Sequence, residues 1–355
     1  MKIKLVSKAL LFSVSFIFCQ LLSACAQQAG SDEQQTEVIN PTAEKFMGRW
    51  AMYLPGGAGY IKVHNTDGFI DAEMLWYGGS VTPVEGLYFT EEGMVITGVS
   101  NVVRKRNESG KAIRTHKLTH RIEFRLVSDD EMEGKAVFVN PDGMSVSRIT
   151  KFTAKQIPDL PNRPDLSTIK YGKKIKLFNG KDLSGWELTN PDQKNGFGVS
   201  DGALVNKPVH KEGEHGGYGN LRTIEEFEDF KLNIEVNIFA GSNSGIYLRG
   251  IYEVQVLDSY GKDLNPHNMG GLYSRITPSV AAEKPAGEWQ ELEIILYKRH
   301  VTVILNGQNI IDNQPLEGVT GGALTADEFI PGPIYLQGDH GEVSFRNIIL
   351  TPIVK

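Results

Sequence analysis

Apolar and polar residues alternate in short runs along most of the chain, a pattern typical of β-strands that bury one face. Glycine, proline, asparagine and aspartate separate the runs, and almost no long stretch has the spacing of a helix. The clearest alternation occurs at 230–238, 245–249, 252–258, 289–296 and 334–337. Asn306-Gly307 joins two further apolar runs and predicts a tight hairpin. These features predict an all-β chain in which residues 171–355 form an antiparallel jelly-roll β-sandwich.

Residues 41–155 predict a smaller β domain, either an up-and-down barrel or a small sandwich. Its strand-like runs lie at 59–63, 69–77, 84–89, 93–99, 116–127, 132–139 and 144–153. Gly48-Arg-Trp50 resembles the lipocalin signature. That resemblance implies a barrel whose base is closed by Trp50 packed against an arginine, for which Arg148 is the candidate. We interpret Arg104-Lys-Arg106 as a solvated hairpin rather than a ligand contact.

Residues 156–170 are predicted to connect the two domains. Pro158, Pro161 and Pro164 fall within seven residues of one another. Proline cannot donate to a sheet ladder and favours an extended backbone, so this stretch predicts a stiff linker rather than a strand.

The beginning of the chain has the pattern of an export signal. Three lysines within the first eight residues precede an apolar run at 9–22, which is the length of a signal peptide and too short to be a spanning helix. The run ends in Leu22-Ser-Ala-Cys25, which resembles the bacterial lipobox. The resemblance implies that residues 1–24 are removed and that lipid on Cys25 holds the protein on a membrane.

The polar stretch 25–40 then predicts a flexible tether, because it is too polar to bury a core. Ala26 follows the cysteine where an aspartate would indicate inner-membrane retention, and this favours the outer membrane. Which face of that membrane carries the protein stays open.

Composition narrows the possible chemistry. Loss of the three signal-peptide lysines from 37 basic residues leaves 34 against 43 acidic ones, a net charge of −9. No basic run of five or more exists, so nucleic acid is not an expected partner. Cys19 is removed with the signal peptide, and Cys25 carries lipid. Disulfides, thiol catalysis and cysteine-bound zinc are therefore excluded.

The polar faces of the predicted C-terminal strands carry residues suited to a sugar site. Amides, carboxylates, tyrosines and an arginine match vicinal hydroxyls and stack on pyranose rings. The members of this set are Glu235, Tyr247, Arg249, Glu253, Gln255 and Gln337. The glycine-flanked loop after Gln337 adds Asp339 and His340, a pair that fits a satisfied turn, a positioned base or a metal ligand.

Several blocks of this region resemble the 3-keto-disaccharide hydrolase family in order, over about residues 175–352. They are Leu177-Phe-Asn-Gly-Lys-Asp-Leu-Ser-Gly-Trp186, Asn243-Ser-Gly245, Tyr247-Leu-Arg249, Tyr252-Glu-Val-Gln-Val-Leu-Asp258, Gly270-Gly-Leu-Tyr273, Pro285-Ala-Gly-Glu-Trp289, Asn306-Gly307, Leu336-Gln337 and Phe345-Arg-Asn-Ile348. The resemblance implies a concanavalin-like jelly roll. It also implies a carbohydrate substrate oxidised to a ketone at sugar carbon 3. A base removes the acidified C2 proton, the aglycone leaves from C1, and water adds to the enone.

This chemistry needs a base near C2, a donor or positive group at the C3 oxygen, and an acid near the leaving group. Glu253 or His340 is the expected base, and Arg249 is expected to stabilise the enolate oxygen. The expected substrate-binding residues are Gln255, Asn243, Tyr247, Gln337, Tyr273 and Asp339, with Glu235 as a partner of Arg249.

Asp258 is a further catalytic candidate on the same strand. It has the opposite strand parity to Glu253, so it reaches the site only if the strand ends or bulges before it. Otherwise it anchors the following turn. A divalent metal held by Glu253, Asp258 and His340 would also stabilise an enolate, although no compact ligand motif is present and no cofactor is required.

Three other functions remain open. The first is a non-catalytic carbohydrate-binding lipoprotein, because jelly rolls often bind glycans. The second is a conventional glycosidase, for which Glu291 and Glu293 are the obvious adjacent carboxylates. The third is a structural lipoprotein whose first domain carries the function.

Overall fold

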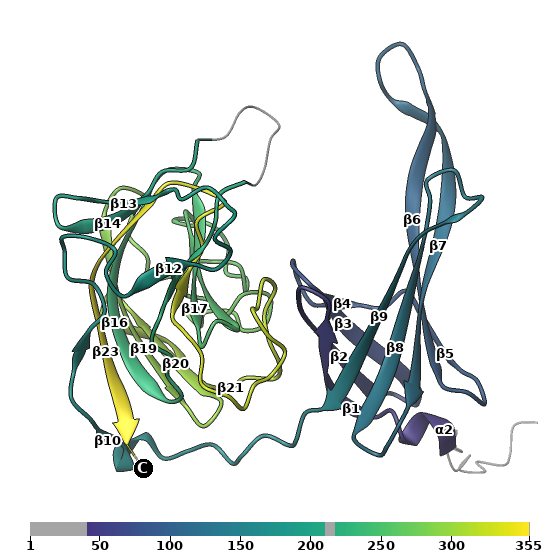
Figure 1. Cartoon of the computed structure of the whole chain (residues 1–355), viewed down its shortest axis with the longest axis horizontal. Coiled ribbons are helices and arrows are strands. Elements are labelled where there is room, and N and C mark those ends of the chain that lie inside the picture. Colours follow the sequence, from purple (N-terminus) through teal and green to yellow (C-terminus); the bar gives the residue numbers. More distant parts are fainter. Residues whose placement is uncertain (1–40, 210–216, 355) are drawn as a thin grey trace, which may run out of the picture. The chain divides into compact units, whose positions relative to one another are not determined.

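Almost every regular element in the computed structural model is a β-strand, which confirms the all-β prediction (Figure 1). The structure describes residues 41–209 and 217–354. The predicted signal peptide, Cys25 and the tether therefore lie outside the described residues. Within these two ranges, no helix is both long and apolar enough to cross a membrane.

The first sheet follows a short helix, α2 (Pro41–Glu44), and contains nine antiparallel strands. They are β1 (Gly48–Leu54), β2 (Gly57–Thr66), β3 (Phe69–Trp76), β4 (Thr82–Pro83), β5 (Gly86–Phe89), β6 (Met94–Arg106), β7 (Ala112–Leu126), β8 (Glu131–Val139) and β9 (Val146–Gln156). Their order is β4-β3-β2-β1-β9-β8-β7-β6-β5. Consecutive strands pair and the first strand pairs with the last, as in an up-and-down barrel, while β4 and β5 form the two edges.

Trp50 lies at the centre of a core formed by the inward residues of these strands. It is fully buried, and its indole N–H donates to the Phe46 carbonyl oxygen at 2.9 Å. The predicted packing of Arg148 on Trp50 is wrong. Trp50 pairs with Gln156, eight residues further along β9, or about 26 Å at the rise of a strand. The Arg148 guanidinium lies over the Phe138 ring instead, 4.5 Å from its centroid.

The remaining strands form two antiparallel sheets after a 3₁₀ turn, η1 (Leu166–Thr168). They are β10 (Lys170–Tyr171), β11 (Ile175–Lys176), β12 (Trp186–Leu188), β13 (Phe197–Ser200), β14 (Ala203–Asn206), β15 (Leu221–Thr223), β16 (Phe230–Ile238), β17 (Asn243–Leu248), β18 (Tyr252–Leu257), β19 (Trp289–Tyr297), β20 (His300–Leu305), β21 (Gln308–Pro315), β22 (Tyr335–Leu336) and β23 (Val343–Val354). The larger sheet has the order β13-β14-β23-β16-β19-β20-β21, with β10 and β11 also pairing with β23. The smaller sheet has the order β12-β15-β22-β17-β18.

The two sheets pack through their apolar faces, as the alternating sequence predicts, which confirms the β-sandwich. Leu232, Ile234 and Leu292 from the larger sheet are buried, as are Ile246 and Val254 from the smaller sheet. Pro41–Lys355 forms one compact unit, and no strand interrupts the stretch between the end of β9 and the start of β10. The predicted domain boundary at 156–170 stays a prediction.

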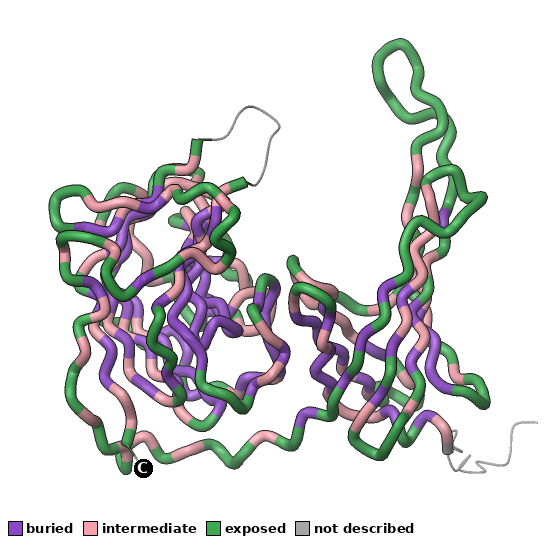
Figure 2. Tube along the Cα trace, viewed as in Figure 1, coloured by how far each residue is buried: buried purple, intermediate pink, exposed green. Residues whose placement is uncertain are grey.

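Strand β18 departs from the expected alternation of buried and exposed residues. All of Tyr252–Val256 is buried, whereas β16 alternates strictly (Figure 2). Irregular chain covers the free edge of β18, since the Gly271 carbonyl and the Gly270 amide both bond to the backbone of Gln255. Gly321 lies over the polar face, where its carbonyl accepts a bond from Tyr247. This cover turns an ordinary polar strand face into an enclosed environment.

Candidate active site

A row of polar side chains runs across the smaller sheet on the face away from the core. Tyr247 of β17 lies directly opposite Glu253 of β18 on one side and Tyr335 of β22 on the other. Directly opposed residues of antiparallel strands point to the same face. Tyr273 extends the row, because its backbone N–H donates to the Glu253 carbonyl at 3.0 Å.

Glu253 is the central group of this row and is only 3 % exposed. Its backbone N–H donates to Thr320 Oγ1 at 2.9 Å, which attaches the strand to the loop above it. Burial raises the pKa of the Glu253 carboxyl to about 8, although the Tyr247 hydroxyl and the charge of His340 act in the opposite direction. Glu253 therefore changes its charge near neutral pH, as a catalytic acid or base must.

The Tyr247 hydroxyl contacts two acceptors but has one proton. It lies 2.8 Å from Glu253 Oε2 and 2.7 Å from the Gly321 carbonyl oxygen. When Glu253 is ionised, Tyr247 donates to the carboxylate. When Glu253 is protonated, the carboxyl donates to Tyr247, which then donates to Gly321. The hydroxyl thus satisfies both charge states of the acid.

Tyr335 supports Tyr247 from the neighbouring strand. The two rings stack with centroids 3.9 Å apart and planes 9° from parallel. Burial raises the pKa of both phenols well above the ordinary value of 10. Both rings therefore keep their hydroxyl protons throughout the physiological range and act as donors.

A second row of residues lies beside the first and contains unpaired amide oxygens. Gly245 faces Gln255 across the strands, and the Gln337 backbone N–H donates to the Gly245 carbonyl. Gln255 Nε2 donates to Asn243 Oδ1 at 3.0 Å. Oε1 of Gln255 and Oε1 of Gln337 are buried and lack a hydrogen-bond partner within the described residues. These oxygens can accept bonds from ligand hydroxyl groups.

Gly245 provides the space that the Glu253 side chain occupies. A Cβ atom placed on Gly245 would overlap Oε1 of Glu253 and crowd the rest of its carboxyl group. The carboxyl group therefore leans over the glycine, from the first row towards the second.

The loop after β22 brings a second titratable group to the site. His340 Nδ1 lies 2.6 Å from Asp339 Oδ1, and the His340 side chain is about half exposed. The hydrogen bond with Asp339 raises the pKa of His340 above its usual range, and the charge of Glu253 adds to this effect. Glu253 and His340 therefore influence each other's ionisation, with Glu253 enclosed and His340 open to solvent.

Arg249 is not brought into this group. It follows β17 in a left-handed conformation with φ of 55°, which turns it off the strand. Its guanidinium donates to the carbonyl oxygens of Glu328, at 2.7 Å, and Ile330. Arg249 thus holds the loop that follows β21 instead of facing Glu253.

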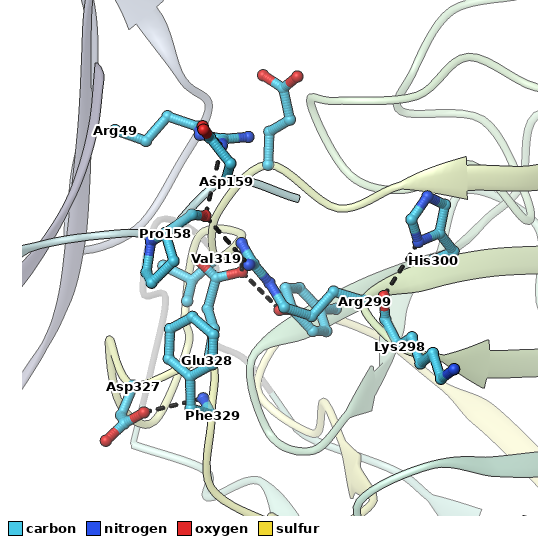
Figure 3. A network of polar contacts seen from close by, with 12 residues as sticks. Arg49, Pro158, Asp159, Lys298, Arg299, His300, Val319, Asp327, Glu328 and Phe329 are labelled. Carbon is cyan, nitrogen blue, oxygen red and sulfur yellow. Dashed lines mark hydrogen bonds and ion pairs between the residues drawn. The ribbon is translucent and has the colours of Figure 1, made fainter. Parts of the chain in front are cut away.

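A buried ion pair holds the same loop at a second point. Arg299 lies 3.4 Å from Glu328 (Figure 3). The Tyr252 hydroxyl also donates to Glu328, at 2.6 Å. The loop bonded in this way carries Thr320 and Gly321, which contact Glu253 and Tyr247. Its sequence is irregular, so no periodicity could have placed it over the site.

Asp258 and Glu235 also lie apart from the Glu253 row. Asp258 Oδ2 accepts the Gly241 amide at 2.9 Å, so it anchors a turn. Glu235 lies on β16 of the larger sheet and accepts bonds from Arg346 and Asn347, not from Arg249. In residues 41–209 and 217–354, no three His, Cys, Asp or Glu side chains are grouped closely enough to hold a metal ion.

Tyr335, Gly245 and Thr320 were not among the expected site residues. Tyr335 could have been found, because it stands on the polar face of an alternating strand together with Gln337. Gly245 and Thr320 give no such signal. One acts by lacking a side chain and the other lies in an irregular loop.

The fold and the buried carboxyl define a jelly-roll β-sandwich with a candidate acid–base site on its smaller sheet. A family model described as the 3-keto-alpha-glucoside-1,2-lyase-like domain matches residues 173–351. This chain belongs to that family, as the sequence blocks predict.

Individual relatives also match part of the chain. A 3-keto-disaccharide hydrolase from Bacteroides thetaiotaomicron is 29% identical over 167 residues; the match covers 39% of this chain and spans 57% of the length of that relative. Two solved putative glycosyl hydrolases from Parabacteroides distasonis are 31% and 22% identical, with TM-scores of 0.41 and 0.40. They cover 53% and 51% of this chain, and 92% and 94% of their own.

Proposed function

We propose that this protein cleaves glycosides that carry a ketone at sugar carbon 3, with Glu253 as the base that removes the C2 proton. The observation that carries the proposal is the buried carboxyl with a raised pKa and a tyrosine hydroxyl as its hydrogen-bond partner. A base with a pKa near the working pH gives the best compromise between being ionised and accepting a proton.

The proposed reaction is an elimination followed by addition of water. Glu253 takes the proton from C2, and the C2–H electron pair forms an enolate with the C3 carbonyl. The enolate collapses, a C1–C2 double bond forms, and the C1–oxygen bond to the aglycone breaks. Water then adds across that double bond, which completes a net hydrolysis.

The other residues of the site are assigned by their position and exposure. The bond with Asp339 raises the pKa of His340 and so favours its protonated form, and its side chain is about half exposed, so we assign His340 as the acid that protonates the departing oxygen. The amides of Gln255 and Gln337 bind the sugar hydroxyls and the C3 oxygen. Tyr247 donates its hydrogen bond to the carboxylate of Glu253 before the reaction and to the Gly321 carbonyl afterwards.

Two chromogenic glucosides that differ only at C3 test the proposal. The 3-keto glucoside should be cleaved and the 3-hydroxyl glucoside should not. Deuterium at C2 of the keto substrate should slow cleavage and be lost to solvent, because that bond breaks first. Cleavage without any isotope effect or loss of deuterium would contradict C2 proton removal. Binding of both glucosides without cleavage would support the carbohydrate-binding alternative.

We also propose that the protein is an envelope lipoprotein on the outer membrane, anchored through Cys25. The lipobox-like sequence and the polar stretch that follows it support this location. Mass spectrometry of the mature N-terminus should find a lipid-modified cysteine, and Cys25→Ser should release the protein from the membrane fraction. Retention of the Cys25→Ser protein on membranes would contradict the anchor.

A further inference from the structure

The hairpin of β6 and β7 extends well beyond the strands that flank it. Strand β5 pairs only with residues 94–97 of β6. Strand β8 pairs only with the part of β7 from Arg121 onward. Residues 98–120, here called the basic ribbon, therefore form a two-stranded projection (Figure 1). From Gly98 to Arg106 it is about 27 Å long at the rise of a strand.

The basic ribbon has a charge opposite to that of the whole chain. Its single acid is Glu108, and its six basic residues are Arg104, Lys105, Arg106, Lys111, Arg114 and Lys117. All six are exposed (Figure 2). The full chain carries a net charge of −6, so this concentration of positive charge is local.

These cations supply no ion pair to the described part of the fold, and Arg106 bonds the Gly110 carbonyl at 2.8 Å. Lys105 lies directly opposite Arg114, and like charges in that position repel one another. Within the part of the chain that the structure describes, none of the six cations forms an ion pair with an acid. A two-stranded hairpin without a core is also only marginally stable in water. An exposed, self-repelling ribbon indicates a surface that is neutralised by an anionic partner.

We propose that the basic ribbon binds an acidic polysaccharide, whose repeated carboxylate or sulfate groups lie along the exposed lysine and arginine side chains. Neutral polar side chains also lie on the ribbon and can bond the hydroxyl groups between the charges. They are the exposed Asn101, Thr115 and Thr119, whereas Ser100, Asn107 and Ser109 already bond within the ribbon.

A lipid surface is the main competing partner, because anionic headgroups would also attract these cations. The vesicle arm of the experiment below distinguishes the two partners.

Nucleic acid is a poorer partner for the ribbon than an acidic polysaccharide. The ribbon contains no Phe, Tyr or Trp on which bases could stack. The proposed envelope location and carbohydrate substrate further favour a glycan, which the ribbon would hold close to the enzyme that acts on glycosides.

Binding of the full-length chain to polygalacturonate and to dextran sulfate tests the proposal, with neutral dextran as the uncharged reference. The ribbon variant replaces Arg104, Lys105, Arg114 and Lys117 by Gln. The control variant makes the same change in net charge at the exposed Lys170, Lys173, Lys174 and Lys181. The wild type should bind both polyanions, with an affinity that falls as salt rises. The ribbon variant should bind at least about tenfold more weakly and with a smaller salt dependence, and the control should bind like wild type.

Three results would overturn the proposal. They are no binding by the wild type at low salt, equal loss in both variants, or stronger binding to phosphatidylglycerol vesicles or duplex DNA than to either polysaccharide. Turnover of a neutral, soluble 3-keto glucoside should be the same in all three proteins. That assay separates failure of the ribbon proposal from failure of the proposed catalytic function.

Discussion

Glu235 and Glu253 have equivalent positions in the alternating sequence pattern but different surroundings in the structure. Each stands on the polar face of an alternating strand, one in the larger sheet of the sandwich and one in the smaller. Glu235 accepts bonds from Arg346 and Asn347 on an open sheet face. Glu253 lies under a loop with a neutral phenol as its partner.

The comparison teaches that the partner and the cover decide the chemistry of a strand-face carboxylate. Burial would raise the pKa of Glu235, but bonds from Asn347 and Arg346 and the arginine charge outweigh it and lower the pKa. Burial dominates at Glu253, because no cation bonds to its carboxyl and the distant charge of His340 compensates only in part. A structural carboxylate and a candidate base thus arise from one pattern.

The largest expected difference between the two glutamates is in turnover. Glu253→Gln should lower kcat for a chromogenic 3-keto glucoside by about 10³-fold, because glutamine still accepts a bond from Tyr247 but takes no proton. Glu235→Gln is the matched control and should stay within about twofold of wild type, since it lies on the other sheet. Similar losses in the two variants, or full activity in Glu253→Gln, would break the comparison.

Gly245→Ala tests whether the Glu253 carboxyl must occupy its present position. The added methyl group would overlap Oε1 of Glu253, so kcat should fall by about 100-fold while the chain stays folded. Gly198→Ala is the control, because a Cβ there meets no atom within 4 Å. Equal activity in both alanine variants would show that the carboxyl can move without loss.

Tyr247→Phe should alter the pH profile more than the maximal rate. In a His340→Ala background, which removes the other titrating group and a charge that lowers the pKa of Glu253, kcat/KM should rise with pH to a plateau, with its rising limb above the wild-type value of about 8. Loss of the tyrosine proton removes a bond that favours the carboxylate, so the rising limb should move to higher pH and the rate at neutral pH should fall about tenfold. Tyr335→Phe is the control, since its hydroxyl does not bond to Glu253. A rising limb of the pH profile that moves to lower pH, or does not move, would contradict the assigned role of Tyr247.

A last expected effect is on thermal stability, and its sign should differ between the two glutamates. The pKa of Glu253 is raised in the folded state, so its contribution is complete below the unfolded value of 4.5 and is lost as pH rises through about 8. Glu253→Gln should therefore gain stability relative to wild type between pH 5 and pH 9, on the order of a few kcal/mol.

The lowered pKa of Glu235 gives the opposite dependence. Its contribution is present above the unfolded value and is lost as pH falls through the depressed folded value. Glu235→Gln should be less stable than wild type at neutral pH and should approach it in acid. Melting curves of the three proteins across this pH range provide the measurement, and a shared sign for both variants would contradict the comparison.

Period-two alternation predicted the strands and one shared face for Tyr247, Glu253 and Gln255, because side-chain direction in a strand follows from local backbone geometry. The same argument placed Arg249 with them and could not anticipate the left-handed turn at that residue. The cover over Glu253 comes from residues more than sixty positions away, at Thr320 and Gly321. Such contacts depend on tertiary packing, which periodicity does not encode.

Gly245 contributes to the site because it has no side chain and so leaves space for the carboxyl of Glu253. A survey that truncates side chains one at a time assigns such a position no role, because there is nothing to truncate. During evolution, every replacement of this residue adds volume where the carboxyl of Glu253 lies. The site therefore depends on this vacancy as it does on a functional group, because filling it would leave Glu253 in the sequence but displaced from its position in the site.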